Sequence, residues 1–129
     1  MKQPPAIEPA SVTGPGFDPM DRIVEALENI ESFVDHLQMS PQDLSYLNKH
    51  LPGILALRRT ISHQLGMLED EPYLYPPARL KILHEENEKI FIFLERVVGT
   101  MDPWDEKGFK QACKALDEAL IKFDNILTP

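Results

Sequence analysis

Apolar residues recur alternately three and four positions apart along four stretches of the chain. This spacing places side chains on one face of an α-helix. It predicts helices over residues 19–38, 77–98 and 103–127 and one that begins just after residue 40 and carries apolar residues from position 44 to position 68, joined by short connections. Because short connections make consecutive helices antiparallel neighbours, the pattern predicts an all-α, up-down-up-down four-helix antiparallel bundle.

One helix-start signal precedes three of these stretches. It is an Asp or Ser followed by proline and, three residues after the first position, by Asp; the three copies begin at Asp18, Ser40 and Asp102. A side-chain oxygen at the first position can accept from free N–H groups, and proline fits the first helical position. We therefore expect these three residues to be N-caps. Met39 and Leu44 are expected to pack together as a hydrophobic staple.

The second stretch runs through Pro52-Gly53, a pair that normally ends a helix. The apolar spacing keeps its phase across the pair, which favours one kinked helix. A split at this point is the alternative, and it would give five helices instead of four.

Residues 1–17 contain four prolines and two glycines and show almost no apolar periodicity. Such a segment cannot bury enough surface to offset the entropy of ordering. We therefore divide the chain into a Pro/Gly-rich N-terminal arm, residues 1–17, and a helical bundle domain, residues 18–129. The arm is expected to be extended and held by the bundle or by a partner.

The length and composition are those of one globular domain without a membrane span. A chain of 129 residues buries one core, and no apolar run approaches the roughly 20 residues that cross a bilayer. The first residues lack the apolar segment of a secretory signal. A single cysteine, Cys113, fits a reducing compartment, so we expect a cytoplasmic protein.

The net charge of −8 disfavours nucleic acid as a partner, because binding to phosphates needs clustered Lys and Arg. The acids Asp21, Glu25 and Glu28 fall on one stripe of the first predicted helix. Two interpretations stay open for them. They form either a solvated outer face or a docking surface for a basic protein partner.

Arg58 and Asn87 are the only polar residues on the predicted core stripes. Counting from the connection between their helices places them at a similar height in the bundle. We expect a polar layer that includes an acid such as Asp21, Glu25 or Glu86. Such a layer either fixes the pairing of the helices or lines a pocket.

Arg58 is also followed five residues later by His63. This spacing resembles the R-x4-H element of the HEPN family of small helical nucleotide-binding and RNase domains. The resemblance covers six residues and implies that Arg58 contacts phosphate while His63 takes part in RNA cleavage at a dimer interface. Other catalytic chemistry is not indicated. The four histidines lack the Glu-x-x-His spacing of di-iron bundles, and Cys113 lies on an apolar stripe as an inert thiol, so we expect no metal and no cofactor.

Several apolar residues are left over after the stripes are assigned to the core. Phe91 flanks the stripe of the third helix, Ile92 points away from it, and Tyr73 and Tyr75 lie in the connection before it. They either widen the core and cap the end of the bundle, or form a surface for a partner or for self-association into a homodimer. The sequence thus predicts a non-enzymatic protein–protein interaction module (an adaptor, chaperone-like or assembly subunit) that acts through helical faces and the arm. A HEPN-like domain is the alternative.

Overall fold

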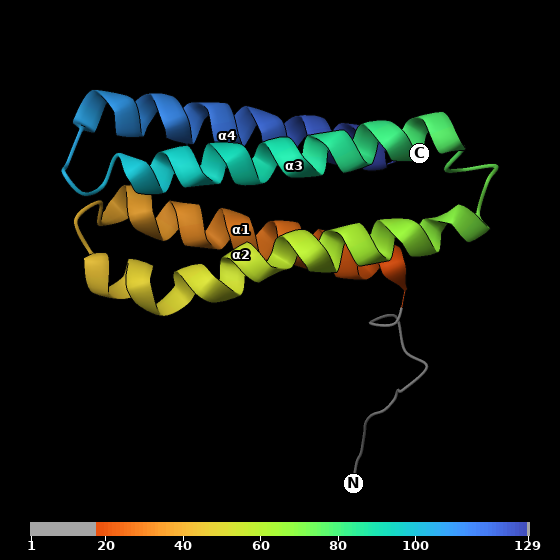
Figure 1. Ribbon diagram of the computed structural model, residues 1–129, viewed down its shortest axis with the longest axis horizontal. Helices are drawn as coiled ribbons and strands as arrows, with labels where there is room; N and C mark the ends of the chain where they lie inside the picture. The colour runs from red at the N-terminus through yellow and green to blue at the C-terminus, as the bar shows by residue number, and fades with distance from the viewer. Residues whose placement is uncertain (1–17, 129) are drawn as a thin grey trace, which may run out of the picture.

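The computed structural model describes residues 18–128 as four long α-helices packed side by side. They are α1 (Pro19–Met39), α2 (Leu44–Met67), α3 (Pro77–Gly99) and α4 (Glu106–Leu127), and a short 3₁₀-helix, η2 (Leu68–Asp70), follows α2. Each long helix runs antiparallel to the next (Figure 1). The predicted four-helix antiparallel bundle is confirmed, whereas the predicted N-terminal arm, residues 1–17, lies outside the described residues.

The core lies where the four apolar faces meet along the bundle axis. Burying a Leu, Ile or Phe side chain stabilises the fold by roughly 1.5–3 kcal/mol, and all four long helices contribute such residues. The largest side chains that are fully buried are Phe33, Phe123, Ile23, Ile30, Leu37, Ile61, Leu65, Leu83, Ile90, Leu94, Leu116 and Leu127. All of these except Phe33 lie on the stripes that the sequence predicts.

The helix-start signal acts as predicted only at α1. There the Asp18 carboxylate accepts from the N–H of Met20 at 2.9 Å, and proline occupies the first helical position. At α2 the prediction of Ser40 is wrong, because Asp43 is the N-cap and accepts from the N–H of Tyr46 at 3.0 Å. The predicted staple is also wrong, since Met39 is 85% exposed.

The same shift occurs at α4, where Asp102 is not the N-cap. Asp105 caps the helix by accepting from the N–H of Gly108 at 3.0 Å, and its own N–H donates to the carbonyl of Thr100 at 2.8 Å. The chain must reverse between antiparallel helices, so the first residues of the signal form the turn and the last acid meets the new helix. A Cβ at Gly108 would collide with the Asp105 carboxylate, so a larger residue there would displace the capping group.

Helix α2 continues without a break through Pro52-Gly53, so the alternative of five long helices is wrong. Pro52 has no N–H to give to the carbonyl of Asn48, four residues earlier. Both residues are exposed, which lets water supply the missing donor. The position is tolerated because the interruption faces solvent.

Asn87 and Arg58 lie at one height, as predicted. Asn87 is fully buried, and its side-chain amide donates to the main-chain carbonyl of Arg58 at 3.2 Å. The Arg58 side chain, however, leaves the core and pairs with Glu88 on the surface of α3 at 3.0 Å. A long arginine can place its backbone at an interface and its charge in water.

The expected acid of that layer is therefore wrong. Asp21 and Glu25 are exposed on α1, and Glu86 is buried between other partners. Its carboxylate lies 3.1 Å from the ammonium of Lys89 and 3.4 Å from that of Lys122 on α4. This pair of contacts links α3 to α4.

The connection between α2 and α3 is fastened to the end of α4. The Tyr75 hydroxyl donates to the carbonyl of Leu127 at 2.8 Å. The Arg79 guanidinium donates to the carbonyl of Ile126 at 2.6 and 2.8 Å and to that of Thr128 at 2.9 Å. These bonds satisfy carbonyls at a helix end that have no partner within the helix.

Within residues 18–128, no helix has the length and apolar character that crossing a membrane requires.

Candidate functional site

The loosest seam of the bundle lies between its first and last helices. Helix α1 packs closely along α2, and α3 along α4, but α1 and α4 approach each other at few positions. The seam opens into a cavity of about 660 Å³, which we call the α1–α4 groove. Its lining residues are Glu31, Val34, Asp35 and Gln38 of α1 and Lys110, Cys113, Lys114, Asp117 and Leu120 of α4.

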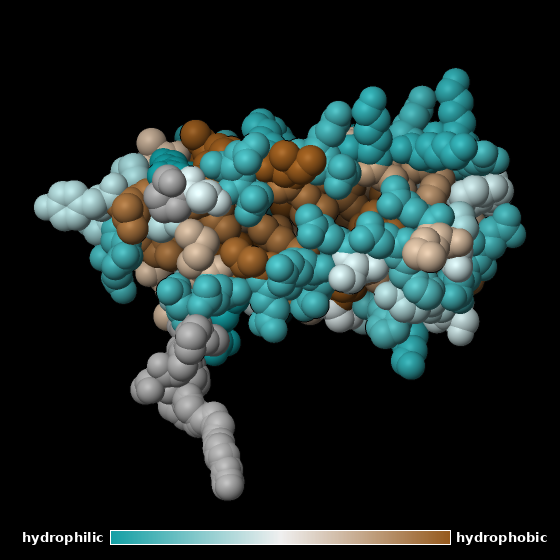
Figure 2. All heavy atoms as spheres, turned by 180° about the vertical axis from the view of Figure 1, so that it is seen from behind, coloured by the Kyte–Doolittle hydropathy of each residue, from teal (hydrophilic) through white to brown (hydrophobic). Residues whose placement is uncertain are grey.

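The groove has an apolar floor between charged rims. Val34, Cys113 and Leu120 form the floor and are buried, whereas the charged side chains that line the groove are exposed. Figure 2 shows the face formed by α1 and α4, on which hydrophobic surface runs lengthwise between rows of hydrophilic side chains. Beside the floor, Val24 and Ile121 add exposed apolar surface.

Carboxylates crowd together at one end of this groove. Burial raises the pKa of Glu31, and the negative charges of Asp117, Asp35, Asp124 and Glu28 raise this pKa further. Asp117 and Asp124 belong to α4, so the repulsion acts across the seam. A cation placed among these groups would relieve it.

The other end of the groove carries lysines. Lys110 and Lys114 lie on the first half of α4. The Lys110 ammonium pairs with the carboxylate of Glu106 at 3.0 Å, whereas Lys114 has no hydrogen bond or ion pair within the described residues. The lysine end therefore offers one cation free to meet a ligand.

The thiol of Cys113, on the floor of the groove, is expected to react slowly. Burial raises the pKa of Cys113 to about 11, against a smaller opposite effect of a hydrogen bond with Gln38. The thiolate is the reactive form of cysteine, and it is scarce at neutral pH when the pKa is this high. Cys113 is thus a packing residue, as the sequence predicts.

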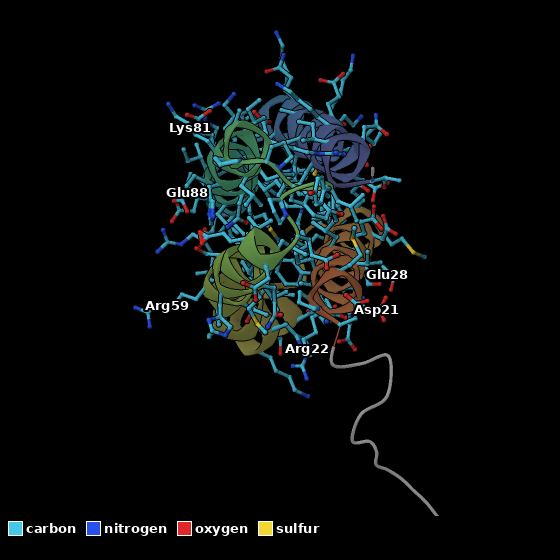
Figure 3. The ribbon with its side chains drawn as sticks, turned by 90° about the vertical axis from the view of Figure 1, so that its right-hand side faces the viewer. Asp21, Arg22, Glu28, Arg59, Lys81 and Glu88 are labelled. Atoms are coloured by element: carbon cyan, nitrogen blue, oxygen red, sulfur yellow. The ribbon has the colours of Figure 1, made fainter. Side chains whose placement is uncertain are left out.

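The structure places the predicted acidic stripe beside this groove. Asp21, Glu25 and Glu28 are exposed along α1, and Glu28 is among the charges that act on Glu31. Figure 3, viewed along the bundle, shows Asp21 and Glu28 pointing away from the core on the side of α1. The stripe extends the acidic end of the groove toward the start of α1.

Of the four residues considered for an apolar partner surface, two are buried, and for these two the alternative of a wider core and a capped bundle end is confirmed. Tyr75 is 2% exposed and Phe91 is 5% exposed, so neither side chain can serve as a contact on the free protein. Tyr75 fills the end of the bundle because its hydroxyl finds the Leu127 carbonyl, and Phe91 belongs to a core face wider than the stripe. Tyr73 and Ile92 are exposed, but they lie on the α2–α3 connection and on α3, apart from each other.

Arg58 and His63 do not share a site. Arg58 lines a shallow pocket of about 320 Å³ with Glu88, Phe91 and Ile92, and His63 is not part of that pocket. Five residues along a helix turn a side chain by about 140°, which directs the two groups to different sides of α2. This placement gives no support to phosphate binding and RNA cleavage by the pair.

Sequence reasoning missed the α4 half of the groove. Lys114, Asp117, Ile121 and Asp124 follow one another three or four positions apart, which is a second stripe beside the apolar one. This spacing could have indicated a surface beside the core. A helical stripe that is mostly charged but includes an apolar residue is expected to lie along the edge of the buried face.

The residues described include no group of three or more His, Cys, Asp or Glu side chains arranged to hold a metal ion. The chain matches no protein-family model, and it has no significant match among curated proteins or solved structures.

Proposed function

We propose that this protein is a non-enzymatic protein-binding module, an adaptor or assembly subunit of the cytoplasm, whose α1–α4 groove takes an amphipathic helix from a basic protein partner. One observation carries the proposal. The apolar side chains of Val24 and Ile121 are exposed beside a groove on whose rims carboxylates outnumber free cations.

Helix-in-groove binding needs an apolar trough to bury one face of the incoming helix and polar rims to select it. The floor residues are buried, so Val24 and Ile121, exposed beside the floor, provide the apolar contacts. The rim acids around Glu31 provide the selection, because a Lys or Arg of the partner would replace repulsion with attraction. The net charge of −8 further favours encounter with a basic partner.

A second copy of this chain fits the groove less well than a basic partner does. Two such faces would bring the acids near Glu31 of one copy against an equally acidic chain. Like charges opposed across an interface disfavour association. We therefore favour binding of a basic helix over self-association into a homodimer.

The test uses two synthetic amphipathic helical peptides that share one leucine stripe. One carries lysines on its polar face and the other carries glutamates, and binding is followed by fluorescence anisotropy of labelled peptide. The lysine peptide should bind at least about tenfold more tightly, a difference of about 1.4 kcal/mol. Its affinity should fall as salt is raised from about 50 to about 300 mM, because exposed charges are screened.

Charge reversal on the protein identifies the surface. Asp117→Lys, on the groove rim, should weaken binding of the lysine peptide by about tenfold or more. Glu85→Lys, exposed on α3, is the matched control and should change it by less than about twofold. Equal loss in both variants, or equal binding of the two peptides, would contradict the proposal. Comparing the whole chain with residues 18–129 measures what the arm contributes.

A further inference from the structure

The α1–α4 groove has a direction. Because α1 and α4 are antiparallel, the first half of α1 lies level with the second half of α4. At that end the charges near Glu31 are all acidic, and they come from both helices. At the other end α4 contributes Lys110 and Lys114, opposite Gln38 of α1, while Asp35, which also acts on Glu31, lies between the two ends. The charge along the groove therefore changes from strongly acidic near Glu31 to nearly neutral at the other end, where Lys114 is unpaired within the described residues.

Apolar side chains lie along the same length, exposed at the acidic end and buried along the floor. Val24 and Ile121 are exposed at the acidic end, and the buried floor continues toward Gln38. From Val24 to Gln38, the rise of about 1.5 Å per residue gives about 21 Å. A helix of about four turns covers this distance.

We propose that the occupant of the groove is a charge-segregated amphipathic helix of about four turns, from another protein. Its lysines or arginines lie in the half that meets Glu28, Glu31, Asp117 and Asp124. Its aspartates or glutamates lie in the half that meets Lys114. This proposal rests on the proposed function and adds the order of charges along the partner.

The dipole of the incoming helix fixes its direction. Acids are favoured in the first turn of a helix and bases in the last turn. A helix that obeys this rule has its N-terminus beside Lys114 and its C-terminus among the acids around Glu31. It therefore runs parallel to α4 and antiparallel to α1.

The experiment compares three labelled peptides of identical composition and identical leucine stripe, titrated with the whole chain. The first has glutamates in its N-terminal half and lysines in its C-terminal half, the second has the reverse order, and the third alternates them. The first should bind at least about tenfold more tightly than the third and more tightly than the second. A photo-crosslinker at its C-terminus should label residues 18–31 or 117–128, and one at its N-terminus should label residues 106–114.

Variants separate this inference from the proposed function. Lys114→Glu should reduce the preference for the first peptide over the third by about fivefold or more. Lys81→Glu, on α3 across the bundle from the labelled acids of α1 (Figure 3), should leave the preference unchanged. Equal binding of all three peptides, sensitive to Asp117→Lys, would overturn the charge order and leave the groove in place. Failure of any peptide to bind would overturn both proposals.

Discussion

The hydroxyl of Tyr75 donates to the main-chain carbonyl of Leu127, 2.8 Å away, and joins the α2–α3 connection to the last turn of α4. The two residues are 52 positions apart, and both are buried. Burial raises the pKa of the Tyr75 hydroxyl above its usual value, so the group stays protonated and remains a donor. The bond closes one end of the bundle.

Replacing Tyr75 by Phe should therefore destabilise the protein by about 1–2 kcal/mol, because a buried carbonyl loses a hydrogen bond. The free energy of unfolding, measured by urea denaturation, checks this expectation. Tyr73→Phe is the matched control, since Tyr73 is fully exposed only two residues away, and it should change stability by less than about 0.5 kcal/mol. Equal effects of the two substitutions would show that the Leu127 contact contributes nothing.

Asn87→Leu should leave stability unchanged or raise it by up to about 2 kcal/mol. The Asn87 side chain donates to Arg58, but its buried oxygen Oδ1 has no partner among the described residues, and a half-satisfied buried amide is costly. The midpoint of urea unfolding gives the change, with Asn125→Leu, exposed on α4, as control. A loss of more than about 1 kcal/mol would show that the single hydrogen bond outweighs the unpaired oxygen.

Two glycine-to-alanine substitutions should act in opposite directions. At Gly53, inside α2, an added Cβ meets nothing within 4 Å, so alanine should stabilise the helix by about 0.5–1 kcal/mol. At Gly108 the same methyl displaces the Asp105 carboxylate from its capping position, so stability should not rise and should fall by up to about 1 kcal/mol. Thermal unfolding of both variants beside the unchanged chain measures the contrast. Stabilisation by Gly108→Ala equal to that by Gly53→Ala would refute the role of the cap.

Glu31→Gln should stabilise the protein at neutral pH. Because the pKa of Glu31 is raised in the folded state, the folded chain holds this proton more readily than the unfolded chain does. The stability that this proton gives is present below the unfolded pKa and is lost as pH rises through the folded pKa. The gain from glutamine should be largest near pH 7 and vanish below about pH 4.

Urea midpoints measured across that pH range test the sign, and Glu25→Gln on the same helix serves as control. A gain that persists unchanged in acid would contradict the electrostatic explanation. The same Glu31→Gln variant should bind the lysine peptide more weakly, because it removes one of the acids that attract it. Stability and binding are then expected to change in opposite directions.

Cys113 should react with iodoacetamide far more slowly than an ordinary thiol. A pKa of about 11 in place of 9.0 lowers the thiolate fraction at pH 8 by about a hundredfold, and burial slows access further. Mass spectrometry of the alkylated chain follows the rate, with the urea-unfolded chain as reference. Because Cys113 lies on the groove floor, a saturating lysine peptide should slow the reaction again; acceleration by the peptide would place it elsewhere.

The helices and most of the core could be predicted because apolar spacing alone determines which residues face inward. The N-caps of α2 and α4 could not, since Ser40 and Asp43 both suit a cap and the choice depends on how many residues the turn uses. The stripe correctly predicted that the backbone of Arg58 lies at the helix interface. It did not show that the long side chain reaches the surface and pairs there with Glu88. For Tyr75 and Phe91 the sequence left burial and exposure open, because it does not show which aromatic residues find a partner inside.

The candidate site was half predictable. The acids of α1 form a stripe that the sequence displays, and the structure leaves them exposed. The sequence does not show that Asp117 and Asp124 of α4 lie near these acids. Their proximity follows from the loose packing of α1 against α4, which only the structure reveals. A periodic pattern assigns faces to each helix, but it does not state how far apart two helices stand.

Fastening the last turn of α4 through main-chain oxygens has a consequence for how this chain can evolve. Arg79 holds the carbonyls of Ile126 and Thr128, and every amino acid supplies such a carbonyl. Substitutions at positions 126 and 128 therefore leave these acceptors in place, whereas most substitutions at positions 75 and 79 remove the donors. The donors that hold the last turn of α4 thus lie some fifty residues earlier in the chain.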